Sequence, residues 1–162
     1  MRITNEEPTQ RQLTIGFPSA LLYYRYEVLW KNFFTSLGVK VITSQPTNKE
    51  TLCLGSESAI DESCLSAKIY LGHVRTLIGK CDYILVPRIS NWGRQRCMCT
   101  RFESLYDLVC NVFRDTGQKF LSYNVAVSKK LTEETAFLNL GLELGFPRKM
   151  VKEAYKTSRK KE

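Results

Sequence analysis

The chain has 162 residues, of which 43% are hydrophobic, so it is long enough for one domain with a buried core and too apolar for a disordered chain. Its longest uninterrupted apolar run, residues 20–24, is much shorter than the roughly 18–20 residues of a membrane span. The polar N-terminus has neither the apolar stretch of a secretory signal nor the acid-poor composition of a transit peptide. We therefore expect a cytoplasmic protein with no membrane partner.

The formal net charge of +8 is concentrated at the C-terminal end of the chain. Residues 148–162 hold seven basic and two acidic residues, a net charge of +5, which leaves +3 for the first 147 residues. A basic run of this kind usually forms a solvated helix face. Nucleic acid is therefore not the expected partner.

The first half of the chain alternates short apolar segments with segments of helical periodicity. The expected elements are a strand at residues 13–17, a helix at 22–37, a strand at 39–43 and a shorter helix at 47–54. Asp61 is the expected N-cap of the next helix, which ends before Gly79.

The second half continues the same alternation. Its expected elements are a strand at 82–86, a helix at 102–113, a strand at 120–127, a helix at 131–144 and a last helix that starts at Pro147. Residues 88–101 show no periodicity, so we expect a long functional loop there. The connections are too long for hairpins, which predicts an α/β fold: a mainly parallel sheet with helices on both faces, in a Rossmann-like three-layer domain.

This pattern divides the chain into three parts. They are a polar N-terminal arm (1–12), an α/β domain (13–145) and a basic C-terminal helix or tail (146–162). Because the apolar stripe of the last helix is narrow, we expect that helix to be an assembly element outside the core.

Cysteines are the main candidates for chemistry, and without a secretory signal we interpret them as core thiols, metal ligands or reactive thiols rather than disulfides. Cys64 lies near the start of a helix, whose dipole favours the thiolate, although a small buried residue is the alternative. Cys97 and Cys99 lie in the long loop, where a thiol has little packing reason to occur. The cysteines expected in the core are Cys53, Cys81 and Cys110.

Other residues limit the chemistry further. The loop arginines would stabilise thiolates or bind an acidic substrate; they are Arg88, Arg94, Arg96 and Arg101. His73 is the only histidine, which excludes zinc sites that need several, and a structural role is the expected one. The sequence has no G-x-G-x-x-G, P-loop or G-x-S-x-G motif, so nucleotide binding and hydrolase chemistry lack their usual support.

Ordered segments over residues 13–110 carry a family resemblance. They are Ile15-Gly16-Phe17-Pro18, residues 20–26, Pro46-Thr47-Asn48-Lys49-Glu50, Asp61-Glu62-Ser63-Cys64, Lys68, Gly72-His73-Val74, Asp82-Tyr83-Ile84 and Val86-Pro87-Arg88. Together they resemble the N-terminal half of the acyl-CoA dehydratase activase-related family, which is related to the D component of 2-hydroxyglutaryl-CoA dehydratase.

The resemblance implies that Cys64 and Cys99 are ligands of a 4Fe-4S cluster and that an ATP-dependent activator delivers the electron. The chain departs from the family at Ser66, where proline is usual, and at Thr100-Arg101, where Pro-Lys is usual. Members of the family continue through a second domain that supplies a further cysteine. We therefore expect a second copy of the chain, or a partner subunit, to complete the site.

The leading hypothesis is an iron-sulfur-binding half-module that assists electron transfer to, or reductive activation of, a 2-hydroxyacyl-CoA dehydratase-type enzyme. It would act as a non-catalytic or partial component, with Arg88, Arg94 and Arg96 helping to set the cluster potential. The alternative is a cluster-free protein-protein interaction domain that docks through the C-terminal helix. A nucleic-acid binder that uses the basic tail is a third and weaker hypothesis.

Overall fold

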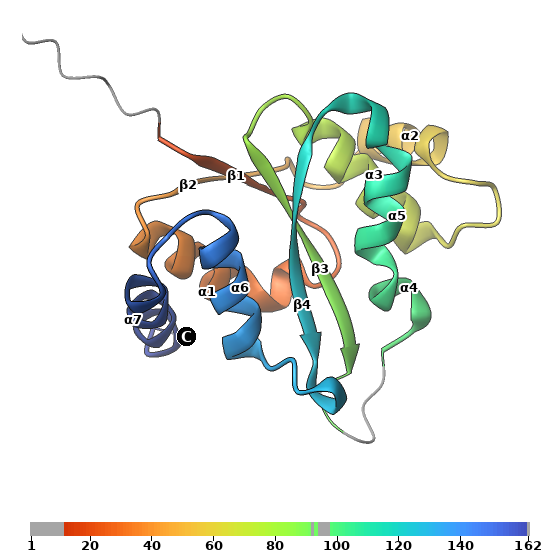
Figure 1. Cartoon of the computed structure of the whole chain (residues 1–162). Helices are drawn as coiled ribbons and strands as arrows, with labels where there is room; N and C mark the ends of the chain where they lie inside the picture. The colour runs from red at the N-terminus through yellow and green to blue at the C-terminus, as the bar shows by residue number, and fades with distance from the viewer. Residues whose placement is uncertain (1–11, 92, 94–97, 162) are drawn as a thin grey trace, which may run out of the picture.

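In the part of the chain that the structure describes, four parallel strands form one sheet, in the order β2-β1-β3-β4 (Figure 1). They are β1 (Thr14–Phe17), β2 (Lys40–Thr43), β3 (Tyr83–Asn91) and β4 (Lys119–Ala126). The computed structural model describes residues 12–91, 93 and 98–161 of the chain. The expected parallel α/β sheet is confirmed.

Helices cover both faces of this sheet (Figure 1). One layer consists of α1 (Tyr23–Ser36), α6 (Glu133–Glu143) and α7 (Arg148–Arg159). The opposite layer consists of α2 (Lys49–Ser58), α3 (Leu65–Leu77), α4 (Thr100–Glu103) and α5 (Leu105–Val112). Short 3-10 helices, η1 (Arg114–Thr116) and η2 (Val127–Lys129), flank β4. The result is the expected three-layer, Rossmann-like arrangement.

A separate apolar core lies on each face of the sheet. β3 contributes to both cores, because successive side chains of a strand point to opposite faces. Ile84 and Val86 belong to the core beneath α3 and α5, whereas Leu85 and Ile89 belong to the core beneath α1 and α6. The second of these cores is rich in aromatic side chains; they include Phe17, Trp30, Phe33, Tyr123 and Phe137.

The third strand is longer than the sequence predicts, because Pro87 lies within it rather than at its end. Among the described residues, β1 pairs with β3 only at Tyr83 and Ile84, so β4 is the one described neighbour of the rest of β3. A proline lacks the backbone N–H that a strand with two neighbours would use, and it is tolerated where one side of the strand is free. The expected loop over 88–101 is corrected accordingly: β3 extends to Asn91, and α4 starts at Thr100.

Three helix assignments also differ from expectation. The helix expected over 47–54 is α2, which continues through Gly55 to Ser58. Cys64, not Asp61, is the N-cap residue of α3, because residues 61–63 form a turn. The single helix expected over 102–113 is two helices, α4 and α5, which meet at Ser104.

The last helix packs on the domain core, which corrects the expectation that it lies outside it. Val151 and Ala154 of α7 are buried among the core residues of α1 and α6, and the Tyr155 ring lies 5.1 Å from the Phe137 ring. The narrow apolar stripe of α7 is enough for this packing because α7 approaches α6 closely at Gly141. A Cβ on Gly141 would lie 2.3 Å from Val151 Cγ2. A separate role of residues 146–162 in assembly stays a prediction.

Candidate functional site

Cys64 is the residue at which α3 begins. Its backbone is extended (φ −62°, ψ 152°), and its carbonyl accepts the first hydrogen bond of the helix from Lys68 N at 3.1 Å. The side chain is exposed and makes no capping hydrogen bond. The backbone is therefore fixed while the thiol is left available for chemistry.

Cys99 occupies the equivalent position at the start of α4, with nearly the same backbone angles (φ −64°, ψ 153°). On its N-terminal side, Met98 N donates to Ser90 O at 3.0 Å, which ties the segment to the end of β3. On its C-terminal side, Phe102 N donates to Cys99 O at 3.0 Å, and the Phe102 ring packs against the core. The thiol of Cys99 is likewise exposed and uncapped.

The two cysteines line one pocket, with a volume of about 140 Å³. Its other lining residues are mostly apolar and come from the β1–α1 turn, α3, α4 and α5; they are Leu21, Ser66, Ala67, Arg101, Phe102 and Leu105. The structure thus brings together the two residues that the sequence singles out as cluster ligands. Their role as ligands stays a prediction.

The position of this thiol pocket follows from the strand order. β2 lies beside β1 on one side and β4 lies beside β3 on the other, so the connections leave β1 and β3 in opposite directions. Ligands of such sheets bind in the crevice at the carboxyl ends of the two strands where the order reverses. Leu21 follows β1 and Cys99 follows β3, and both line the thiol pocket.

The thiol pair is an incomplete donor set for a metal centre. Within the described residues, no group of three or more His, Cys, Asp or Glu side chains is arranged to hold a metal ion. Cys97 lies outside the described residues, as do Arg94 and Arg96. A 4Fe-4S cluster is normally held by four thiolates, so Cys64 and Cys99 fit half of that requirement.

Two arginines of the predicted loop, Arg88 and Arg101, are described by the structure, and they make different contacts. Arg101 lines the thiol pocket. Arg88 instead forms an ion pair with Asp107 of α5, with 3.0 Å between Nη2 and Oδ2. The charge of Arg88 is thus largely balanced within the domain, and Arg101 is the better placed of the two to act on the thiols.

The remaining described cysteines are not part of this pocket. Cys81 is half-buried, and burial raises the pKa of its thiol to about 11; burial also raises the pKa of the half-buried Cys110 thiol. Cys53 is exposed on α2, so the expectation that it lies in the core is wrong. It lies on the outer side of α2, whose buried residues are Thr51 and Gly55.

His73 is buried within α3 and takes part in a polar network. Its Nδ1 hydrogen-bonds with Ser44 Oγ at 2.8 Å, and its Nε2 with Thr47 Oγ1 at 2.9 Å. Ser44 Oγ also accepts from Ser19 N at 2.8 Å. Burial lowers the pKa of His73, which favours the neutral ring. The expected structural role fits this network, which joins the ends of β1 and β2 to α3.

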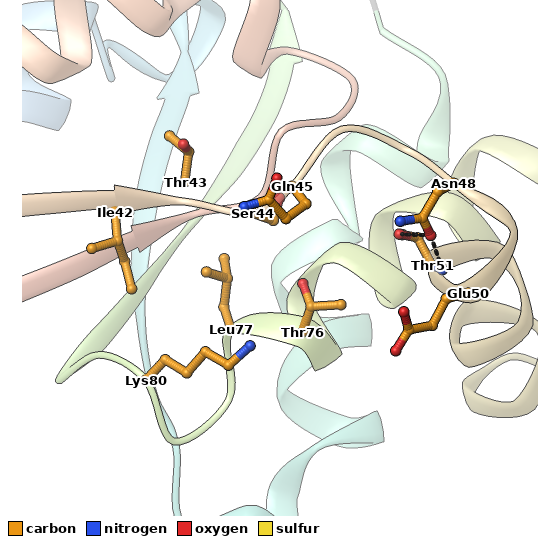
Figure 2. A pocket seen from close by; sticks show the side chains of 10 residues that line it. All are labelled: Ile42, Thr43, Ser44, Gln45, Asn48, Glu50, Thr51, Thr76, Leu77 and Lys80. Carbon is orange, nitrogen blue, oxygen red and sulfur yellow. Dashed lines mark hydrogen bonds between the residues drawn. The ribbon is translucent and has the colours of Figure 1, made fainter.

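Figure 2 shows a second and more polar pocket, with a volume of about 290 Å³, beside the end of β2. Glu50 of α2 and Lys80, which follows α3, line it with opposite charges. Ser44 also lines this pocket, but its hydroxyl is engaged by His73 and Ser19. Neither Cys64 nor Cys99 belongs to it.

Sequence reasoning did not single out Leu21, which lines the thiol pocket. It also did not single out Ser19 and Ser44, which belong to the polar network of His73. The signal available for the two serines was their position, because each is a short polar residue shortly after a strand. For Leu21 the sequence held no such signal, because its conformation depends on contacts that are distant along the chain.

Over residues 14–162, the chain matches the family model described as a CoA enzyme activase uncharacterised domain. The protein therefore belongs to this family, which confirms the resemblance to activase-related proteins and extends it through α7. Membership links the chain to the activation of CoA enzymes. No curated protein and no solved structure matches it. Among the described residues, no helix has the length and apolarity needed to cross a membrane.

Proposed function

We propose that this protein is a cytoplasmic iron-sulfur-binding half-module that assists the reductive activation of a 2-hydroxyacyl-CoA dehydratase-type enzyme. The observation that carries the proposal is the meeting of Cys64 and Cys99 in one pocket at the carboxyl ends of β1 and β3. Family membership supports the connection with CoA-enzyme activation.

Cys64 and Cys99 would hold a 4Fe-4S cluster, which, when bound, takes up and passes on a single electron. The protein keeps both thiols at the start of a helix, with their backbones anchored and their side chains free. Arg101 lines the same pocket and brings a positive charge to the side of the two thiols.

A second copy of the chain, or a partner subunit, would supply the remaining ligands. Leu65, which follows Cys64 directly, is 60% exposed and presents apolar surface beside the thiol pocket. A partner that brings its own thiolates to this pocket would also cover Leu65. In this assembly an ATP-dependent activator gives the electron and the dehydratase receives it, so the half-module is a partial component and not a complete enzyme.

Anaerobic reconstitution with ferrous iron and sulfide tests the proposal. Iron and sulfide are measured in the parent protein and in the variants Cys64→Ser and Cys99→Ser, each of which should lose the cluster because a serine hydroxyl is a poor substitute for a thiolate. Cys53→Ser is the matched control, because Cys53 is also exposed but lies outside the thiol pocket.

Equal iron content in the parent protein and in Cys64→Ser would contradict the assignment. Cys81→Ser and Cys110→Ser should keep the cluster, and Cys97→Ser decides whether a third cysteine of the chain takes part. A parent protein that takes up no iron would favour the cluster-free interaction domain.

A further inference from the structure

Leu21 has an unusual backbone conformation beside the thiol pocket. Its φ is +54°, and among the described non-glycine residues only Lys130 also has a positive φ. Tyr23 N donates to Ala20 O at 3.2 Å, and Leu22 follows with φ −70° and ψ −11°. Leu21 is thus the first central residue of a tight turn, at a position where a positive φ normally requires glycine. A positive φ strains a residue that carries a side chain.

The residues around Leu21 hold the turn in place. Ser19 N donates to Ser44 Oγ at 2.8 Å, and Ser19 Oγ donates to Ser44 O at 2.9 Å. Ala20 is buried in one apolar core and Leu22 in the other. The turn would therefore form equally well, and with less strain, around a glycine. The presence of a leucine requires another explanation, and strained residues of this kind cluster at functional sites.

The Leu21 side chain is the contribution of the β1–α1 turn to the thiol pocket. It packs against the core beneath α3 and lines the pocket together with Cys64 and Cys99. Ala67, Phe102 and Leu105 complete an apolar lining on the other sides. Without the Leu21 side chain, the pocket would lose the wall that separates it from the turn.

We propose that Leu21 is a positioning residue that keeps water from the inner side of the Cys64–Cys99 pocket. For a bound cluster, this inference rests on the function proposed above. Water near a cluster stabilises its more negatively charged, reduced form, so an apolar wall lowers the reduction potential. The strained leucine would thus help to keep the bound group a strong reductant.

The first test needs no metal. A variant with Cys53, Cys97 and Cys99 replaced by serine is labelled at Cys64 with a bimane dye, whose emission depends on the polarity around it. Leu21→Gly should shift the emission to longer wavelength and increase quenching by iodide. Lys130→Gly is the matched control, because Lys130 also has a positive φ but does not line the pocket. Leu21→Ala keeps the strain and removes most of the side chain, and it should give the same change as Leu21→Gly.

The second test uses the anaerobically reconstituted protein and a redox titration followed by electron paramagnetic resonance. Leu21→Gly should raise the reduction potential, and Lys130→Gly should leave it unchanged. Unchanged emission and quenching in both Leu21 variants would overturn the inference, as would an unchanged potential. A parent protein without iron would contradict the proposed function alone, because the dye measurement still decides the role of Leu21.

Discussion

Gly72 of α3 lies directly against the carbonyl oxygen of Thr51 in α2. A Cβ built on Gly72 would stand 1.9 Å from that oxygen, and one on Gly55 would stand 1.8 Å from Lys68 O, so the backbones of the two helices touch at these glycines. Helices approach so closely only where side chains are absent. This contact sets the distance between α2 and α3, and α3 carries Cys64 at its first turn.

Gly72→Ala should therefore destabilise the domain strongly. Overpacking against backbone atoms cannot be relieved by a rotamer change, so we expect a loss of about 3 kcal/mol or more in the free energy of unfolding. Urea denaturation measures this loss. Ser56→Ala on the exposed side of α2 is the control and should change the stability by less than about 0.5 kcal/mol. A Gly72→Ala protein as stable as the control would show that α2 and α3 separate easily.

His73 should make the stability depend on pH. Burial lowers its pKa from the ordinary value of 6.5, so below about pH 6.5 the unfolded chain binds a proton that the folded protein does not. The free energy of unfolding should then fall with decreasing pH, by at most about 1.4 kcal/mol per unit, until the folded pKa is reached.

His73→Gln removes the titrating group and keeps a side chain that can hydrogen-bond with Ser44. Denaturation curves between pH 5 and pH 8 should have a smaller slope of stability against pH in this variant than in the parent protein. Parallel slopes in the two proteins would mean that other groups cause the dependence.

Val151 tests the docking of α7. It is 1% exposed and contacts Gly141, so Val151→Ala should lower the free energy of unfolding by about 2 kcal/mol. Met150, its neighbour, is 39% exposed, and Met150→Ala should have little effect. Truncation after Gly145 should destabilise the whole domain, because it uncovers the Phe137 ring. If the truncated protein were as stable as the parent, α7 would not be part of the core and would instead be a separate assembly element.

Thiol alkylation separates the cysteines by their surroundings. At pH 8 with limiting iodoacetamide, peptide mapping by mass spectrometry should find Cys53, Cys64 and Cys99 modified first, because they are exposed. Cys81 should react slowly, since burial raises its pKa to about 11 and little thiolate is present. The same reaction in denaturant should abolish the difference, and fast modification of Cys81 in the folded protein would contradict its burial.

Local sequence patterns predicted the elements well where the pattern alone determines them. The apolar periodicity of β1, α1 and α3 and the rule that parallel sheets carry their chemistry at the carboxyl ends were enough to bring Cys64 and Cys99 to the same edge. The prediction that the third strand ends at Pro87 was wrong. A proline is tolerated within β3 because β1 no longer pairs with the strand there, and this pairing is a property of the whole sheet.

The other features that the sequence did not predict also depend on contacts between separate segments of the chain. Close to Leu21, Ser19 bonds with Ser44, 25 residues away, and nothing near Leu21 in the sequence indicates that bond. The packing of α7 depends on a glycine in the preceding helix, so the width of its apolar stripe was a poor guide. Exposure of Cys53 depends on which side of α2 meets α3, and the two glycines at that contact determine it.

The docking of α7 has an electrostatic consequence. Its apolar side is occupied by α1 and α6, so the helix presents a row of ammonium groups to the solvent; they include Lys149, Lys152 and Lys156, all exposed. Any association through this row would be governed by counterions, and its strength should decline as ionic strength increases and the Debye length shortens. The affinity of such a complex would thus depend mainly on the salt concentration. An apolar interface would instead show a marked dependence on temperature.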